Sequence, residues 1–129
     1  MPFKIDYEKS QMNAKEYLDR LSCLISTGCY TVQKVPVTSI TDSTNLTDLV
    51  MVRIPNKHER SVKNDLKMLS RLSTENKRLF YCTHLLGIKM RNLRSDCYTS
   101  DYTFGNVYDK YKNMILNFAL MREALIEYR

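Results

Sequence analysis

The sequence has little glycine and proline and no tryptophan. Only three glycines and three prolines occur among its 129 residues, which is not the composition of a loop-rich or disordered chain. The glycines are scattered, so neither a GxGxxG loop nor a GxxxxGKS/T loop is present to cradle a phosphate. We therefore expect a compact domain that lacks the common nucleotide-binding loops.

Groups for catalysis and metal binding are also scarce. The chain has two histidines and four cysteines, and none of them form a CxxC or HxxxH spacing. On a helix, Cys82 and His84 would point roughly 160° apart, so they would not form a nucleophile–base pair. We therefore expect a protein that is not an enzyme and that binds no metal or other cofactor.

Long apolar runs are missing as well. The most apolar stretch, NMILNFALM from Asn113, is shorter than the roughly 18 residues of a membrane span. The opening residues MPFKIDYEKS include acids and lack the apolar centre of a secretory signal. We expect no membrane contact and an intracellular location, in the cytoplasm or nucleus, where the cysteines would be free thiols.

The pattern of apolar residues predicts a single compact domain, 1–129, of the α+β class and mostly helical. Its expected order is α-β-β-α-α-α, with about four helices packed against a short β-hairpin. One helix is expected to open after Pro55. The other expected elements are helices over 6–27, 75–94 and 106–127 and strands over 29–41 and 49–54.

Several residues mark where these elements begin or end. Asp6 is suited to cap the first helix, and Gly28 is suited to end it with a left-handed backbone. Pro36 cannot donate a ladder hydrogen bond, so the first strand should bend there or lie at an edge. The apolar segment 49–54 and the helix over 106–127 are possible surfaces for a homodimer.

The positive charge is concentrated in one part of the chain. The net charge is +6. Ten basic and three acidic residues lie between Lys57 and Arg94, whereas the remainder has ten basic and eleven acidic residues. A concentrated surplus of this kind is typical of proteins that bind polyanions.

Within this region, four basic residues recur at helical spacing: Arg60, Lys63, Lys67 and Arg71. We call these four residues the basic ridge. At about 100° per residue they fall within about 80° of one another on a helical wheel. The apolar residues of the same segment fall on the opposite side: Val62, Leu66, Leu69 and Leu72. Like charges at this spacing are mildly destabilising, so their shared sign favours a role in binding.

Three interpretations of the basic ridge are open: contact with a polyanion, a merely solvated helix face, or a surface for an acidic protein. The following helix adds Lys77, Arg78 and Arg91, and Lys77, His84 and Arg91 would form a narrow polar strip on it. Aromatic side chains near this region are candidates for stacking on bases. They are Tyr81, Tyr98, Tyr102 and Phe104.

The sequence thus predicts a small, non-enzymatic nucleic-acid-binding protein that contacts the phosphate backbone. RNA is favoured over DNA because no helix-turn-helix or zinc-finger motif is recognisable. The predicted contacts are Arg60, Lys63, Lys67, Arg71, Lys77, Arg78 and Arg91. The composition would fit a viral accessory protein. The alternative is a helical protein-interaction module that binds and inhibits a host or partner protein through an apolar groove.

Overall fold

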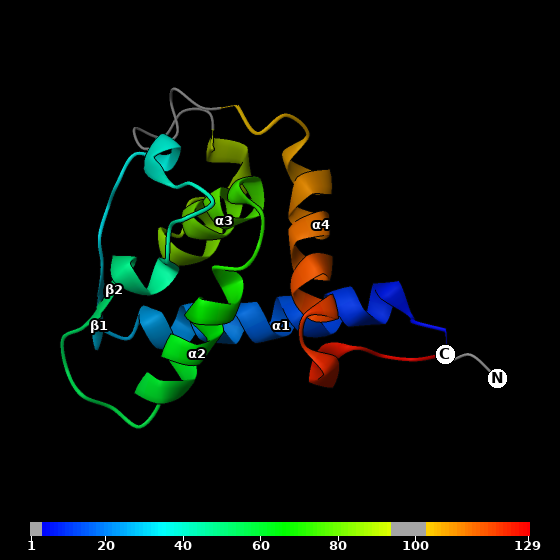
Figure 1. Cartoon of the computed structure of the whole chain (residues 1–129), viewed down its shortest axis with the longest axis horizontal. Helices are drawn as coiled ribbons and strands as arrows, with labels where there is room; N and C mark the ends of the chain where they lie inside the picture. Colours follow the sequence, from blue (N-terminus) through cyan, green and yellow to red (C-terminus); the bar gives the residue numbers. More distant parts are fainter. Residues whose placement is uncertain (1–3, 94–102) are drawn as a thin grey trace.

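The computed structural model describes residues 4–93 and 103–129. Its longest helix, α1 (Tyr7–Ile25), runs along one side of the molecule and is crossed by α4 (Val107–Leu120), as Figure 1 shows. The Asp6 side chain accepts a hydrogen bond from the Lys9 backbone amide at 3.1 Å. Gly28 follows the helix with a φ of +96°, the conformation for which glycine is preferred. The predicted cap at Asp6 is confirmed, whereas the helix ends at Ile25 with Ser26 as its C-cap, so Gly28 lies in the following turn rather than directly after the helix.

The remaining elements complete a mostly helical α+β fold. The α-helices are α2 (Glu59–Leu69) and α3 (Thr74–Phe80), and a π-helical turn, η3 (Tyr81–Leu85), continues directly from α3. The strands are β1 (Tyr30–Val32) and β2 (Val50–Val52). The described 3₁₀ helices are η1 (Val37–Ser39), η2 (Leu46–Leu49), η4 (Met90–Asn92) and η5 (Glu123–Leu125). The predicted fold class and element order are confirmed.

The two strands form a short antiparallel sheet in which Thr31 lies opposite Met51. Both strands are shorter than predicted. The first ends at Val32, before Pro36 turns the chain into η1, and the second is preceded by η2 rather than beginning at Leu49. A two-stranded sheet is marginally stable in water by itself. Here its buried residues Tyr30 and Val50 join the hydrophobic core.

The prediction of one continuous helix over 75–94 was wrong. The helix widens into η3 and ends at Leu86, whose amide donates to the Tyr81 carbonyl. Gly87 follows with a φ of +70°, and the Ile88 amide donates back to the Cys82 carbonyl. A left-handed residue at this point ends the helix, so the chain turns and forms η4 separately.

The last helix is also shorter than the predicted 106–127. It ends at Leu120, and the chain then runs alongside the first described residues, 4–6. The Asp6 amide donates to the Glu127 carbonyl, and the Arg129 amide donates to the Lys4 carbonyl, both at 2.8 Å. Pairing between the ends of the chain therefore replaces the last helical turns.

The core lies where α1, α3 and α4 meet. Its side chains with no exposed surface include Ala14 and Leu18 from α1, Leu79 and Phe80 from α3, and Met114, Phe118 and Ala119 from α4. Across the described residues, none of the helices combines the length and the apolar character that a membrane crossing requires.

Candidate functional site

The basic ridge lies on the outward face of α2. Arg60, Lys63 and Lys67 are exposed on the helix, and Arg71 is exposed in the turn that follows it. Within 4–93 and 103–129, no hydrogen bond or ion pair occupies these four side chains. The three salt bridges found in those ranges use other cations, namely Lys15, Lys110 and Arg122. The structure therefore brings the ridge together as a solvent-facing row of positive charges.

The acid in the middle of α2 does not neutralise this row. Asp65 is buried, and one of its carboxylate oxygens lies 2.6 Å from a guanidinium nitrogen of Arg122. The Tyr17 hydroxyl donates to the same carboxylate at 2.8 Å. Burial raises the pKa of Asp65, although the bond from Tyr17 and the charge of Arg122 oppose that change. Burial and the Asp65 carboxylate raise the pKa of Tyr17 to about 12. Because Asp65 is paired inside the protein, its carboxylate does not neutralise the cations on the exposed face of α2.

Lys77 and Arg78 do not extend the ridge. Lys77 has no exposed surface, and its ammonium donates to the carbonyl oxygens of Asp42 and Thr44 at 2.9 and 3.0 Å. Burial lowers its pKa. Arg78 is partly buried, and its Nε donates to the Ile40 carbonyl at 2.9 Å. These two side chains hold the segment between the strands against α3, so they are corrected from predicted contacts to structural groups.

Arg91 is exposed but separate from the ridge. It lies in η4, which Figure 1 places at the opposite end of the view from α2. The predicted polar strip of Lys77, His84 and Arg91 does not exist, because Lys77 and His84 are buried and the helix ends before Arg91. The structure thus leaves four of the seven predicted contact residues in one exposed row.

The predicted aromatic stacking surface is not available on the described residues. Tyr81 has no exposed surface, and its hydroxyl donates to the Gln33 carbonyl at 2.8 Å. Phe104 is also buried in the core. Tyr98 and Tyr102 lie outside the residues that the structure describes. Bases could not stack on Tyr81 or Phe104 without unfolding their surroundings.

A groove that the sequence did not reveal lies between the sheet and α2. It has a volume of about 320 Å³. Its apolar walls and its polar rim come from different residues. The apolar walls and floor are formed by Tyr30, Val50 and Val52 of the sheet with Val62 and Leu66 of α2. The more exposed polar residues that line it form the rim: Thr47, Asp48, Glu59 and Lys63. Lys63 belongs to both the rim of this groove and the basic ridge, so the two features are continuous.

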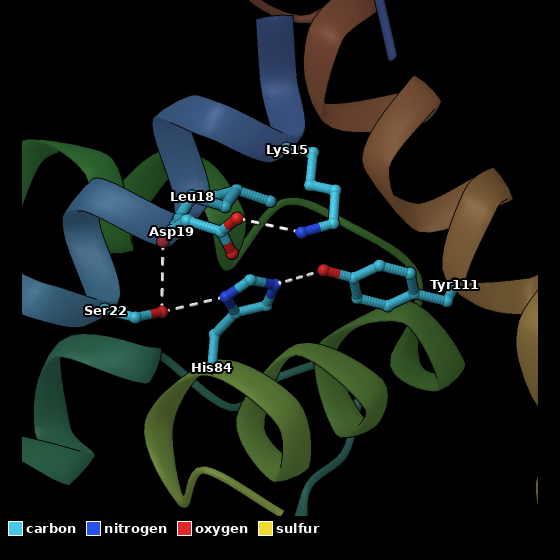
Figure 2. Close-up of polar contacts among 6 residues, drawn as sticks. All are labelled: Lys15, Leu18, Asp19, Ser22, His84 and Tyr111. Carbon is cyan, nitrogen blue, oxygen red and sulfur yellow. Dashed lines mark hydrogen bonds and ion pairs between the residues drawn. The ribbon is translucent and has the colours of Figure 1, made fainter. Parts of the chain in front are cut away.

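A second polar arrangement joins α1, η3 and α4 around His84 (Figure 2). The Ser22 hydroxyl oxygen lies 2.8 Å from Nδ1 of His84, and the Tyr111 hydroxyl oxygen lies 2.8 Å from Nε2. The Ser22 hydroxyl donates to the Leu18 carbonyl at 3.0 Å. Its proton is thus committed, so the His84 Nδ1–H donates to Ser22 and the Tyr111 hydroxyl donates to Nε2. We call Ser22, His84 and Tyr111 the histidine cluster.

The surroundings of His84 keep its ring neutral. The ring stacks between Phe80 and Tyr111, with ring centroids 5.4 and 5.7 Å away. Burial lowers the pKa of His84 to about 4, against a smaller opposing effect from Asp19. Asp19 is itself paired with Lys15 at 2.8 Å above the cluster (Figure 2). The cluster therefore links α1, η3 and α4 through the two hydrogen bonds of one neutral, buried ring.

Sequence reasoning missed the histidine cluster because its members are far apart in the chain. Ser22 is 62 residues and Tyr111 is 27 residues from His84. The described residues also contain no group of three or more histidine, cysteine, aspartate or glutamate side chains placed to hold a metal ion.

No protein-family model matches the chain, and comparisons with curated proteins and with solved structures find no match.

Proposed function

We propose that the protein binds nucleic acid, RNA in preference to duplex DNA, through phosphate contacts to the basic ridge. The observation that carries this proposal is the row of Arg60, Lys63, Lys67 and Arg71, which is exposed and takes part in none of the salt bridges among the described residues. Lysine and arginine in such a row bind phosphates without reading sequence, because they release condensed counter-ions. The proposed activity is binding alone, without catalysis, in an intracellular setting.

The position of α3 supports RNA over duplex DNA. Helices α2 and α3 follow one another across a short turn, as in a helix-turn-helix, whose second helix enters the major groove. Here the second helix is covered by the protein. Its Asn76, Lys77 and Leu79 are all buried. Because α3 could not serve as a recognition helix, the protein would bind through the phosphate backbone and the groove beside the ridge.

The salt dependence of binding tests the proposal. With four phosphates neutralised, log Kobs for a single-stranded RNA should fall with log salt with a slope of about −3, so affinity drops roughly 50-fold between about 50 and 200 mM salt. Each substitution of a ridge lysine by glutamine should reduce the slope by about 0.7. Fluorescence anisotropy with a random RNA and a random duplex DNA would measure this, and a slope near zero would contradict the proposal.

A charge-reversal pair provides a sharper test. Lys63→Glu with Lys67→Glu should abolish RNA binding and leave the unfolding temperature nearly unchanged, because both side chains are exposed. The matched control is Lys9→Glu with Lys112→Glu, which changes the net charge equally at exposed positions off the ridge. Equal losses in both double variants would show that net charge alone matters and would reject the ridge as the binding surface.

The alternative, a protein-interaction module, is favoured by a separate apolar groove between α1 and α4. Its apolar lining includes Met12, Met90, Tyr108 and Ile115. Met12 and Tyr108 are 59% and 56% exposed, so the groove presents two large apolar side chains to solvent. An amphipathic helix is the kind of ligand that such a groove binds. Binding here would respond little to salt and would be lost in Met12→Asp while the charge-reversal pair on the ridge left it intact.

A further inference from the structure

The groove between the sheet and α2 lies directly beside the basic ridge. Lys63 stands on its rim, so a strand whose phosphates lie along α2 passes directly over the opening. The floor is apolar, formed by Val50 and Val52 on one side and Val62 and Leu66 on the other. A group that leaves water and enters this groove would bury apolar surface there, which is favourable.

The charges of the groove select the kind of group that can enter. Asp48 and Glu59 stand on the rim together with Lys63. Two carboxylates beside an apolar floor repel a phosphate, whereas the neighbouring ridge attracts one. A neutral planar group is compatible with the floor, and its amino groups could donate to the carboxylates, as the cytosine amino group does to acidic side chains.

The groove is formed by residues that the fold already holds in place. The Tyr30 ring forms part of the wall, and its hydroxyl donates to the Asn56 side chain at 3.1 Å. On the other side, Leu46 at the start of η2 is tied to the end of α2, because its amide donates to the Ser70 hydroxyl at 2.8 Å. A ligand would therefore enter a largely preformed site.

We propose that this groove receives one unpaired base of a single-stranded nucleic acid whose phosphates lie on the basic ridge. This inference rests on the proposed function and deepens it, because it specifies the ligand as a single strand with exposed bases. Bases within a duplex are stacked and paired, and taking one out carries an energetic penalty. The protein should therefore bind a single strand more tightly than a duplex of equal charge.

The direct test compares two ligands that differ only in their bases. The probes are an oligocytidylate of about ten nucleotides, within the usual range of single-strand sites, and an abasic ribose-phosphate chain of the same length. We expect the intact protein to bind the oligocytidylate about tenfold more tightly, the effect of one sequestered base. Equal affinity would overturn the base site and leave phosphate binding standing. Binding of neither probe at low salt would overturn both proposals.

Two neighbouring substitutions locate the effect in the groove. Val52 lines the groove, whereas Met51 points to the opposite face of the same strand and is 61% exposed. Val52→Gln should lower affinity for the oligocytidylate to that for the abasic chain and leave abasic binding unchanged. Met51→Gln should retain the tenfold difference. The same result for both variants would place the base elsewhere and reject the proposal.

Thermal unfolding shows whether Val52→Gln is folded. Val52 is already 40% exposed, so a polar side chain is expected to be tolerated there. If the variant unfolds, the comparison of the two probes on the unaltered protein still decides the question, because it requires no substitution.

Discussion

Lys77→Met is expected to lower the free energy of unfolding by about 3 kcal/mol, because the ammonium makes two charge-assisted hydrogen bonds inside the protein. Methionine is similar in length and fits an apolar site, but it cannot donate to the carbonyl oxygens of Asp42 and Thr44. Those carbonyls would be left without their buried partner, which costs about 1–3 kcal/mol for each group. Urea unfolding would measure the loss, and the unfolding temperature should fall by about 10 °C.

The matched control is Lys67→Met. Lys67 lies on the basic ridge and is exposed, so the same substitution should change stability by less than about 0.5 kcal/mol. Affinity for the abasic ribose-phosphate chain should show the reverse pattern, with a loss for Lys67→Met and little change for Lys77→Met below its unfolding temperature. Equal stability of the two variants would contradict the buried position of Lys77.

Acid is expected to destabilise the protein through the histidine cluster. An unfolded histidine binds a proton below a pKa near 6.5, whereas His84 in the folded protein does so only near pH 4. Between these values the unfolded state binds a proton that the folded state does not, so stability falls as pH falls. His84 should therefore contribute a loss of about 3 kcal/mol that begins near pH 6.5 and levels off near pH 4.

Comparison of variants separates this contribution from those of other groups. His84→Gln should be less stable than the unaltered protein at neutral pH. Because glutamine does not titrate, the His84 part of the pH dependence of stability should be missing in this variant. Ser22→Ala is the control, because it removes the partner of Nδ1 and leaves the histidine buried between Phe80 and Tyr111. Urea unfolding from pH 7 to pH 4 would measure both. The same slope in His84→Gln as in the unaltered protein would contradict the prediction.

Lys77 also bears on the proposed binding surface. Lys77 holds the carbonyls of Asp42 and Thr44, which lie just before η2, and η2 supplies Thr47 and Asp48 to the groove. The groove therefore depends on a lysine that contacts no ligand in the proposal. Weaker single-strand preference in Lys77→Met, with phosphate binding unchanged, would be consistent with that dependence.

Local signals in the sequence were sufficient for the elements with regular periodicity. Asp6 correctly marked the start of α1, and the apolar positions of α2 correctly predicted that the ridge faces outward. Both cases depend on interactions within a few residues. The prediction of a continuous helix over 75–94 was wrong because the apolar pattern of the sequence continues past Gly87. Only the backbone conformation at that glycine shows where the helix ends.

Other positions depended on partners distant in the chain. Helix α4 ends at Leu120 although neither proline nor glycine follows it directly. Shortly after that end, Arg122 reaches Asp65, 57 residues away, and its guanidinium also lies 4.5 Å from the centre of the Tyr17 ring. A helical wheel cannot anticipate such contacts, because it describes one element in isolation.

The sequence by itself determined the class of fold, the order of the helices and strands, and the row of positive charge on α2. Each of these follows from residue type and spacing along a short stretch of chain. Only the tertiary structure decided which cations are accessible. In the sequence Lys77 and Arg91 are both basic residues of one predicted helix, but in the structure Lys77 is buried and Arg91 is exposed. The groove and the histidine cluster were likewise decided by packing, since their walls and hydrogen bonds come from segments that meet only in the folded chain.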